Sequence, residues 1–535
     1  MKKIFLLLMS AIFFLLPTKT NAAGEKILFI PHDDRPISYH QTVQVVEAAG
    51  YKMILPPKEL LNSATDMGHP DELWQWLFEN APAANSAVIA SDSMLYGGLI
   101  PSRKHEVSEE VLNSRLKNFE ELKKKNPSLQ IYVFDSLMRT PYAGFKGNIE
   151  EPDYHVEYGA DLFQYTRLLD KKETSKLNKE EEFYLESYKK KIPEDIWEDW
   201  ITRRQKNISA TKTLMDFTRD GIIDYLILGR DDNAPLSQTH RENKEILAYA
   251  EKNNLPKTKF QSMPGIDEFN ILLLNRAIND MNGEIPFVNV RYNKGKGGDT
   301  IPSYSVEKIS ASIDAAITIA GGFKVPDPAR ADFVLLVNTD KKGKTGEALA
   351  AALDNLAGGK FIPNLKPTSN TKYFAKLVEE YVGKNYPVGV ADISFANGSD
   401  NALMKILHDK NLLFKLQAYS GWNTPTNSTG FAIGAGILAT KMNESDKQKV
   451  LTTRYLDDWI YQANVRPAMI REGYEKFGSL DFYSLLDGDK LSWAENRNTE
   501  LAKDFAEKNL PHFDFLRGLK IKNPWIRMFE CDVIF

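Results

Sequence analysis

The chain repeats one pattern along most of its length, and this pattern limits the possible folds more than any other feature. Short runs of β-branched or aromatic residues end in polar, glycine-containing turns, and amphipathic stretches follow them. This alternation is typical of parallel sheets whose strands are joined by crossover helices. Because the runs are short and apolar, we expect strands that are buried on both faces. The predicted strands are 27–30, 51–55, 87–90, 130–134, 225–228, 259–262, 287–290, 333–337, 388–391 and 414–418.

The pattern predicts an α/β protein with two Rossmann-like lobes. The N-terminal lobe is expected at 23–292 and the second lobe at 293–442, with a glycine-containing connection near Gly297 between them. A charged helical insertion is expected at about 162–220, and a helical region without strands at 443–535. The number of strands also allows a TIM-like barrel with additional elements, so the sequence leaves both architectures open.

The first residues have the three-part layout of a secretory signal peptide. Lys2 and Lys3 precede an apolar run at 4–16, and small residues lead to Ala22. We therefore predict a signal peptide at 1–22 and an extracytoplasmic protein, either periplasmic or secreted. The apolar run is shorter than the roughly 20 residues that cross a bilayer. No stable membrane insertion is expected after cleavage.

Composition excludes several classes of function. The 68 basic and 72 acidic residues give a net charge of -4 and are interspersed, so no nucleic-acid partner is expected. Cys531 is the single cysteine, which excludes an intrachain disulfide. The eight histidines show no paired ligand spacing, and this argues against a multi-histidine zinc site. The segment 294–298 lacks the spacing of a phosphate-binding loop, and the chain has no Gly-x-Ser-x-Gly motif.

Polar motifs follow most of the predicted strands directly, at 31–36, 91–103, 135–139, 229–235, 264–268, 392–400 and 421–427. The carboxyl ends of parallel strands share one rim, so these motifs are expected to converge on one cleft. Grouped carboxylates repel one another and lose hydration, so stability alone does not explain them. The sequence therefore predicts an acidic, polar pocket.

Paired carboxylates in such a pocket predict glycoside hydrolysis. One carboxyl group acts as the general acid and the other as the nucleophile or base, because their environments separate their pKa values. The catalytic candidates follow adjacent strands and are Asp231, Asp232, Asp267 and Glu268.

The substrate-binding candidates are Asp33, Asp34, Arg35, Asp92, Tyr96, Arg103, Asp135, Arg139, Asp392, Asn397, Asp400, Trp422, Asn423 and Asn427. The arginines are expected to hold a carboxylate or sulfate of the substrate or to orient the acids. Trp422, Tyr96 and Tyr419 offer flat faces for a sugar ring, and the asparagines can bind hydroxyl or acetamido groups.

Two other functions remain open at this point. The oxygen ligands Asp33, Asp34, Asp92, Asp231 and Asp232 suit Ca²⁺ or Mg²⁺, which would indicate a metal-dependent hydrolase; no other cofactor is expected. A non-catalytic glycan-binding or solute-binding protein is the third possibility. Each motif also has a structural interpretation, since paired aspartates cap helices and Trp422 can belong to the core.

The motifs at 31–36, 92–99, 264–268, 396–400 and 421–424, together with Ser102 and Arg103, resemble a bacterial family known as domain of unknown function 4127. The resemblance spans about Lys26 to Arg466 and implies one shared architecture. The family's usual first motif has an apolar residue where His32 stands, so the resemblance assigns His32 no role. It supplies no activity, and the mechanism rests on the residues.

Overall fold

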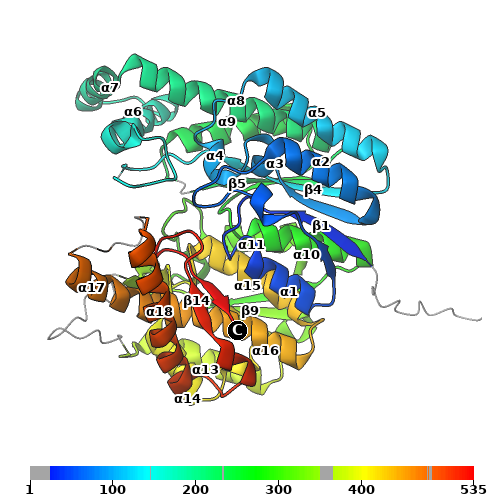
Figure 1. Ribbon diagram of the computed structural model, residues 1–535, viewed down its shortest axis with the longest axis vertical. Helices are drawn as coiled ribbons and strands as arrows, with labels where there is room; N and C mark the ends of the chain where they lie inside the picture. Colours follow the sequence, from blue (N-terminus) through cyan, green and yellow to red (C-terminus); the bar gives the residue numbers. More distant parts are fainter. Residues whose placement is uncertain (1–24, 145, 232–233, 350–364, 479, 481–484) are drawn as a thin grey trace, which may run out of the picture.

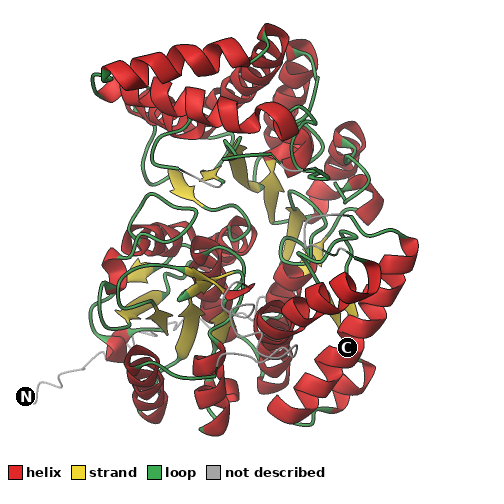
Figure 2. Ribbon diagram, turned by 90° about the vertical axis from the view of Figure 1, so that its left-hand side faces the viewer, coloured by secondary structure: helices red, strands yellow, loops and turns green. Residues whose placement is uncertain are grey.

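The computed structural model describes residues 25–144, 146–231, 234–349, 365–478, 480 and 485–535 (Figure 1). Two open parallel sheets with helices on both faces form its centre (Figure 2). The predicted α/β fold with two lobes is confirmed, and the described strands close no barrel. The signal peptide expected at 1–22 lies outside the described residues.

The two sheets share one winding order. The first has the order β2-β1-β3-β4-β5-β6 and the second β13-β11-β9-β7-β8, and all neighbours are parallel. In each sheet the chain starts at an inner strand, moves to one edge and then crosses to the other side. The strands are β1 (Lys26–Ile30), β2 (Lys52–Ile54), β3 (Ser86–Ala90), β4 (Gln130–Leu137), β5 (Tyr225–Arg230), β6 (Phe260–Pro264), β7 (Phe287–Tyr292), β8 (Phe323–Lys324), β9 (Phe333–Asn338), β11 (Val388–Asp392) and β13 (Ala418–Ser420).

Three details differ from the expectation. Strand β7 precedes the boundary expected at 293, but it pairs with β8 and β9 in the second sheet. The strand predicted at 414–418 is limited to β13, because Leu413–Lys415 forms a 3-10 turn. The C-terminal region, expected to lack strands, contains the antiparallel pair β14 (Lys520–Lys522) and β15 (Asp532–Ile534). These strands have only three residues each, too few for a recognisable pattern.

Helices cover the outer face of each sheet. Those outside the first sheet are α2 (Pro70–Asn80), α5 (Glu109–Lys125), α8 (Glu194–Arg219) and α9 (Gln238–Lys252), and α6 (His155–Thr174) and α7 (Lys179–Lys191) extend the charged insertion beyond them. Those near the second sheet or the C-terminus are α13 (Ser369–Gly383), α14 (Asn401–Asp409), α16 (Glu444–Arg454), α17 (Arg466–Phe477) and α18 (Gly488–Asn509). None of the helices described is long and apolar enough to cross a membrane.

A central layer of helices joins the sheets, and it consists of α1 (His40–Ala48), α10 (Phe269–Asn282), α11 (Ile309–Ile319) and α15 (Pro425–Ala439). Helix α10 packs on β3 and β4, and α15 packs on α10, β11 and β13. Every residue of α15 is buried, and its glycines permit close approach, since a Cβ at Gly434 would lie 2.7 Å from Ile271.

The facing sides of the two sheets therefore share one hydrophobic core. It runs from Phe29 in β1 through Leu272 in α10 to Leu335 in β9. Each such side chain contributes about 1.5–3 kcal/mol when it is fully buried. This shared core holds the two walls of the site in a fixed relation.

Candidate functional site

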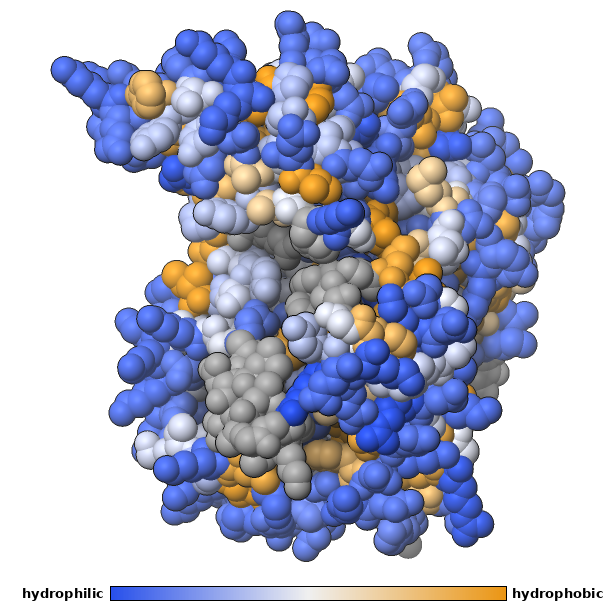
Figure 3. Space-filling model, turned by 60° about the vertical axis from the view of Figure 1, so that its left-hand side comes forward, coloured by the Kyte–Doolittle hydropathy of each residue, from blue (hydrophilic) through white to orange (hydrophobic). Residues whose placement is uncertain are grey.

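A pocket of about 110 Å³ lies where strand ends of both sheets meet the C-terminal segment. The surface is indented between the part that carries the insertion helices and the part below it (Figure 3). The pocket is lined by Asp33, Arg35, Leu99, Ile100, Arg103, Arg139, Glu150, Asp231, Ile266, Asp267, Tyr304, Asn397, Asn423, Thr424, Asn427, Trp525 and Phe529.

The winding order of the first sheet explains the location. The chain leaves β1 toward one edge and leaves β3 toward the other, so the connections after these neighbouring strands diverge. Ligands of open α/β sheets bind at such a switch point. Asp33 and Arg35 follow β1, and Arg103 follows β3 by way of the short helices α3 (Ser91–Leu95) and α4 (Leu99–Ser102).

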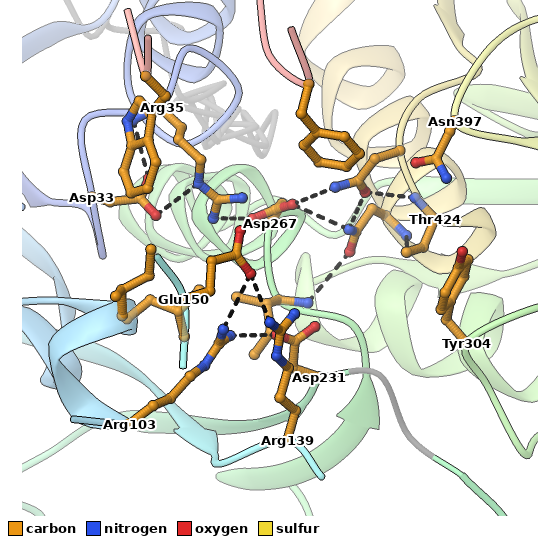
Figure 4. Close-up of a pocket in the computed structure, with 17 residues that line it drawn as sticks. Asp33, Arg35, Arg103, Arg139, Glu150, Asp231, Asp267, Tyr304, Asn397 and Thr424 are labelled. Carbon is orange, nitrogen blue, oxygen red and sulfur yellow. Dashed lines mark hydrogen bonds and ion pairs between the residues drawn. The ribbon is translucent and has the colours of Figure 1, made fainter. Parts of the chain in front are cut away.

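Arg35 links two carboxylates at one wall of the pocket (Figure 4). Its Nε donates to Asp33 Oδ2 at 2.8 Å, and its Nη2 donates to Asp267 Oδ1 at 2.7 Å. The same Nη2 donates to His32 Nε2 at 2.8 Å, and Ser38 Oγ lies 3.0 Å from that ring nitrogen. The first strand end thus provides a buried, hydrogen-bonded ion network.

Asp267 is held in the ionised form. Its Oδ2 accepts hydrogen bonds from Asn423 at 2.8 Å and from Asn427 at 3.3 Å. Burial raises the pKa of the Asp267 carboxyl, but Arg35, His32 and Asn423 outweigh burial and hold that pKa far below its usual range. Asp267 can therefore accept hydrogen bonds or stabilise positive charge, and it cannot donate a proton near neutral pH.

A second ion network surrounds Glu150. Arg139 and Arg527 donate to its two oxygens at 2.8 Å each, and Arg103 Nη1 lies 3.5 Å away. Arg103 Nη2 also donates to Asp231 Oδ2 at 2.5 Å. Burial raises the pKa of Glu150, but the three guanidinium groups outweigh it and bring this pKa well below its usual range.

The second sheet contributes an uncharged wall. Tyr304, which is 40% exposed, donates from its hydroxyl to Glu347 Oε1 at 3.1 Å. Asn397 donates from Nδ2 to the other oxygen of Glu347 at 2.9 Å. The Glu347 carboxylate thus positions both the aromatic ring of Tyr304 and the amide of Asn397. Thr424 caps α15 by accepting a hydrogen bond from the backbone of Asn427, which places Asn427 in the first helical turn.

The structure brings half of the predicted residues together. Those that line the pocket are Asp33, Arg35, Arg103, Arg139, Asp231, Asp267, Asn397, Asn423 and Asn427. Those that lie elsewhere are Asp34, Asp92, Tyr96, Asp135, Glu268, Asp392, Asp400 and Trp422. Asp232 lies outside the described residues.

Asp92 and Asp135 form a buried pair behind the pocket. Ser136 donates to Asp92 at 2.6 Å, and Ser91 and Thr211 each donate to Asp135 at 2.6 Å. Burial raises the pKa of Asp135 to about 6, and burial together with Asp135 raises that of Asp92 further. These carboxyls, expected to bind substrate, instead hold the ends of β3 and β4 together.

Asp392 and Asp400 are also structural. Asp400 caps α14 and accepts from the backbone of Ala402 at 2.9 Å. Asp392 accepts from Asn338 at 2.8 Å and from the Asp400 backbone at 2.7 Å. Burial and the nearby Asp400 raise the pKa of Asp392 to about 7. The carboxyls of this motif thus cap α14 and support the end of β11.

The expected aromatic platforms are not available to a ligand in the pocket. Trp422 is 2% exposed and packs on Phe529 with ring centroids 5.6 Å apart. Tyr96 is buried and stacks on His105 at 4.5 Å. Tyr419 is buried and donates from its hydroxyl to Ser399 at 2.6 Å. These rings are core residues: Trp422 belongs to the core between the sheets, Tyr419 to the cluster shared with the C-terminal region, and Tyr96 to the cluster outside the first sheet.

Other aromatic residues, not identified from the sequence, line the pocket instead. They are Tyr304, Trp525 and Phe529. Trp525 Nε1 donates to Asp34 Oδ1 at 2.7 Å, and this bond joins the C-terminal segment to the first strand end. Burial raises the pKa of Asp34 to about 6 in spite of this bond. The aromatic and charged residues of 525–530 were a visible signal in a region otherwise predicted as helical.

Glu268, a catalytic candidate, points away from the pocket. It precedes α10 and is buried, and a Cβ at Gly430 of α15 would lie 2.5 Å from its side chain. Burial raises its pKa well above the usual range. The start of α10 directs Glu268 into the helical layer, whereas Asp267 before it faces the pocket.

The carboxylates expected to bind a cation are held separately. Asp33 pairs with Arg35 and Asp231 with Arg103, whereas Asp34 and Asp92 lie outside the pocket lining. No group of three or more His, Cys, Asp or Glu residues is arranged to hold a metal ion in the ranges that the structure describes.

The fold and site define a doubly wound α/β protein with two sheets and one polar pocket between their strand ends. The chain belongs to the family described as protein of unknown function (DUF4127), whose model matches residues 27–534. This match confirms the family indicated by the motifs and includes the C-terminal segment that completes the pocket. No curated protein and no solved structure matches the chain.

Proposed function

We propose that the protein is an exported carbohydrate-active protein that binds a saccharide in the pocket between the two sheets. The observation that carries the proposal is the composition of the two walls. Asp267 provides an ionised acceptor at one wall, whereas Asn397 and the aromatic face of Tyr304 line the other. Sugars need this combination, because their rings stack on aromatic faces and their hydroxyl groups bind carboxylates and amides.

The ion pairs of the pocket favour binding as its basic activity. Asp33 and Asp267 share Arg35, and Asp231 pairs with Arg103. A general acid needs a raised pKa, but the pKa values of Asp267 and Glu150 are lowered. These two groups therefore serve as hydrogen-bond acceptors or counter-ions and not as the general acid.

Glycoside hydrolysis is the second candidate, and the bridging position of Arg103 favours it. One guanidinium contacts both Glu150 and Asp231, so two carboxylates face the same pocket from neighbouring positions. Glycosidases use carboxyl pairs roughly 5 to 9.5 Å apart. In this case Asp231 is the group whose replacement abolishes turnover.

The experiment is calorimetric titration of the chain from residue 23 onward with a panel of saccharides and peptidoglycan fragments. Asp267→Asn is expected to lower the affinity about tenfold or more, because a charged acceptor is lost. Asp504→Asn, at an exposed site on α18, is the matched control and should bind like the wild type. Melting curves verify that each variant is folded, and Asn427→Ala provides a second pocket variant. Absence of binding across the panel would contradict the proposal.

A second assay separates binding from hydrolysis. It uses the saccharides of the same panel as aryl glycosides and measures release of the aryl group. If the protein is a hydrolase, the wild type releases the aryl group, and Asp231→Asn binds without turnover. Titratable binding with no release by the wild type identifies a binding protein. Export is tested separately, since mass spectrometry of the secreted protein should find Ala23 at its N-terminus.

A further inference from the structure

Three guanidinium groups from distant segments converge on one carboxylate in the pocket. Arg103 follows α4, Arg139 follows β4 and Arg527 belongs to the C-terminal segment. Glu150 Oε1 accepts from Arg527 at 2.8 Å, and Oε2 lies 2.8 Å from Arg139 and 3.5 Å from Arg103. We call Arg103, Arg139 and Arg527 the arginine triad (Figure 4 labels the first two).

Each member of the triad also has a second acidic partner. The second partners are Asp231 for Arg103 at 2.5 Å, Glu151 for Arg139 at 2.5 Å and Glu530 for Arg527 at 2.8 Å. These partners hold the guanidinium groups in place independently of Glu150. If the Glu150 carboxylate leaves, the donors of Arg103 and Arg139, which line the pocket, remain in place together with the Arg527 donor that held Glu150.

Glu150 is more accessible than the three arginines that hold it. Its side chain is 18% exposed, whereas those of Arg103, Arg139 and Arg527 are 3%, 14% and 2% exposed. It lies between β4 and α6 in a segment outside any helix or strand. The carboxylate can therefore move aside without disturbing a helix, a strand or the core.

From this geometry we infer that the arginine triad is a carboxylate subsite, that Glu150 occupies it when no ligand is bound, and that the ligand is an acidic saccharide whose carboxylate replaces Glu150. This inference rests on the proposed saccharide binding. Guanidinium forks recognise a planar carboxylate through paired hydrogen bonds. Tyr304 and Asn397 lie across the pocket from Arg103 and Glu150 (Figure 4), so the sugar ring and its acidic group have separate walls.

The subsite is tested first with acetate alone. Glu150→Ala removes the internal carboxylate, so acetate is expected to bind and to raise the melting temperature of this variant in proportion to the logarithm of its concentration. The wild type and the exposed control Glu180→Ala should show no such rise beyond their common response to salt. If Glu150→Ala does not fold, Glu150→Gln keeps the shape and removes the charge. Absence of any specific acetate effect would overturn the subsite.

The ligand class is tested with uronic acids and the corresponding neutral sugars, as monomers and as oligomers. The acidic member of a pair should bind about tenfold more tightly, because charge-assisted hydrogen bonds replace neutral ones. Glu150→Ala should increase this ratio, and Arg139→Gln should reduce it toward one.

The two experiments distinguish the inference from the proposed function. Acetate binding by Glu150→Ala without binding of any saccharide would overturn saccharide binding and retain the carboxylate subsite. Equal affinities for acidic and neutral sugars in the wild type and in Glu150→Ala would overturn the acidic ligand and retain saccharide binding.

Discussion

The two sheets wind in the same order but contribute different chemistry to the pocket. The strand ends of the first sheet carry ionised groups, such as Arg35 and Asp267, that line it. The strand ends of the second sheet contribute amides such as Asn423, whereas the buried carboxyl of Asp392 lies outside the lining. Topology thus places polar residues at strand ends, but their neighbours decide what those residues do.

Asp267 and Asp392 show the physical difference. Both are buried near a strand end, and burial raises the pKa of both. Arg35 reverses the effect at Asp267, whereas Asp400 adds to it at Asp392. The presence of a counter-ion therefore decides whether a buried carboxyl is a charged site residue or a hydrogen-bonded support.

The largest expected effect is the loss in free energy of unfolding when the carboxyl of Asp267 or of Asp392 is removed. Asp267→Ala should destabilise the protein by about 3–5 kcal/mol, because it breaks a buried ion network around Arg35. Asp392→Ala should cost about 1–3 kcal/mol, because it leaves donors without an acceptor. Urea unfolding measures both values. Equal losses would remove the distinction between the two sites.

The contributions of Asp392 and Asp267 to the free energy of unfolding should depend on pH with opposite signs. The pKa of Asp392 is raised from 3.8 to about 7, so between these values the folded state binds more protons than the unfolded state. The stability from Asp392 is thus present at low pH and is lost as the pH rises to about 7, at up to about 1.4 kcal/mol per pH unit. Asp392→Asn should weaken this dependence.

Asp267 should show the opposite trend. Its pKa is lowered, so its contribution is present above about pH 4, the unfolded value, and decreases as the pH falls below it. The difference in unfolding free energy between the wild type and Asp267→Asn should therefore become smaller in acid. Chemical unfolding at a series of pH values measures the contribution of each carboxyl as the difference between the wild type and its Asn variant. If this difference changes with pH in the same way for Asp267 and Asp392, the comparison is wrong.

The smallest expected effect tests the uncharged wall. Asn427→Ala removes one donor to Asp267 and should lower the affinity for a saccharide about fivefold, or about 1 kcal/mol. Asn370→Ala is the matched control, because Asn370 donates to the Thr339 backbone and lies outside the pocket lining. Titration calorimetry compares the two variants. Equal changes in affinity would show that the amides of the second sheet do not form a binding wall.

Several parts of the fold and site could be predicted from local sequence. The apolar run at 388–391 corresponds to β11, because a short, fully buried strand leaves a continuous apolar pattern. The motif at 264–268 contains two catalytic candidates, of which Asp267 lines the pocket and Glu268 does not. Adjacent residues at the start of a helix face different directions, and the motif alone does not show which one faces the cleft.

The C-terminal contribution could not be predicted in this way. Trp525 reaches Asp34 from almost the other end of the chain, and Arg527 reaches Glu150. Neither Trp525 nor Arg527 follows a strand of either parallel sheet, so the rule that strand ends share a rim does not place them at the pocket. The amphipathic pattern of this region predicts helices and gives its aromatic and charged residues no role in a site.

By itself the amino-acid sequence determined the parallel α/β fold, the positions of most strands and the family. Burial patterns and turn residues act over a few neighbouring positions, and a single chain records them directly. Only the tertiary structure decided which polar residues meet, which carboxyls are paired with arginines and which aromatic rings face the pocket. Those properties depend on distances between residues that lie hundreds of positions apart, and the charge of a buried group depends on the neighbours that packing places beside it.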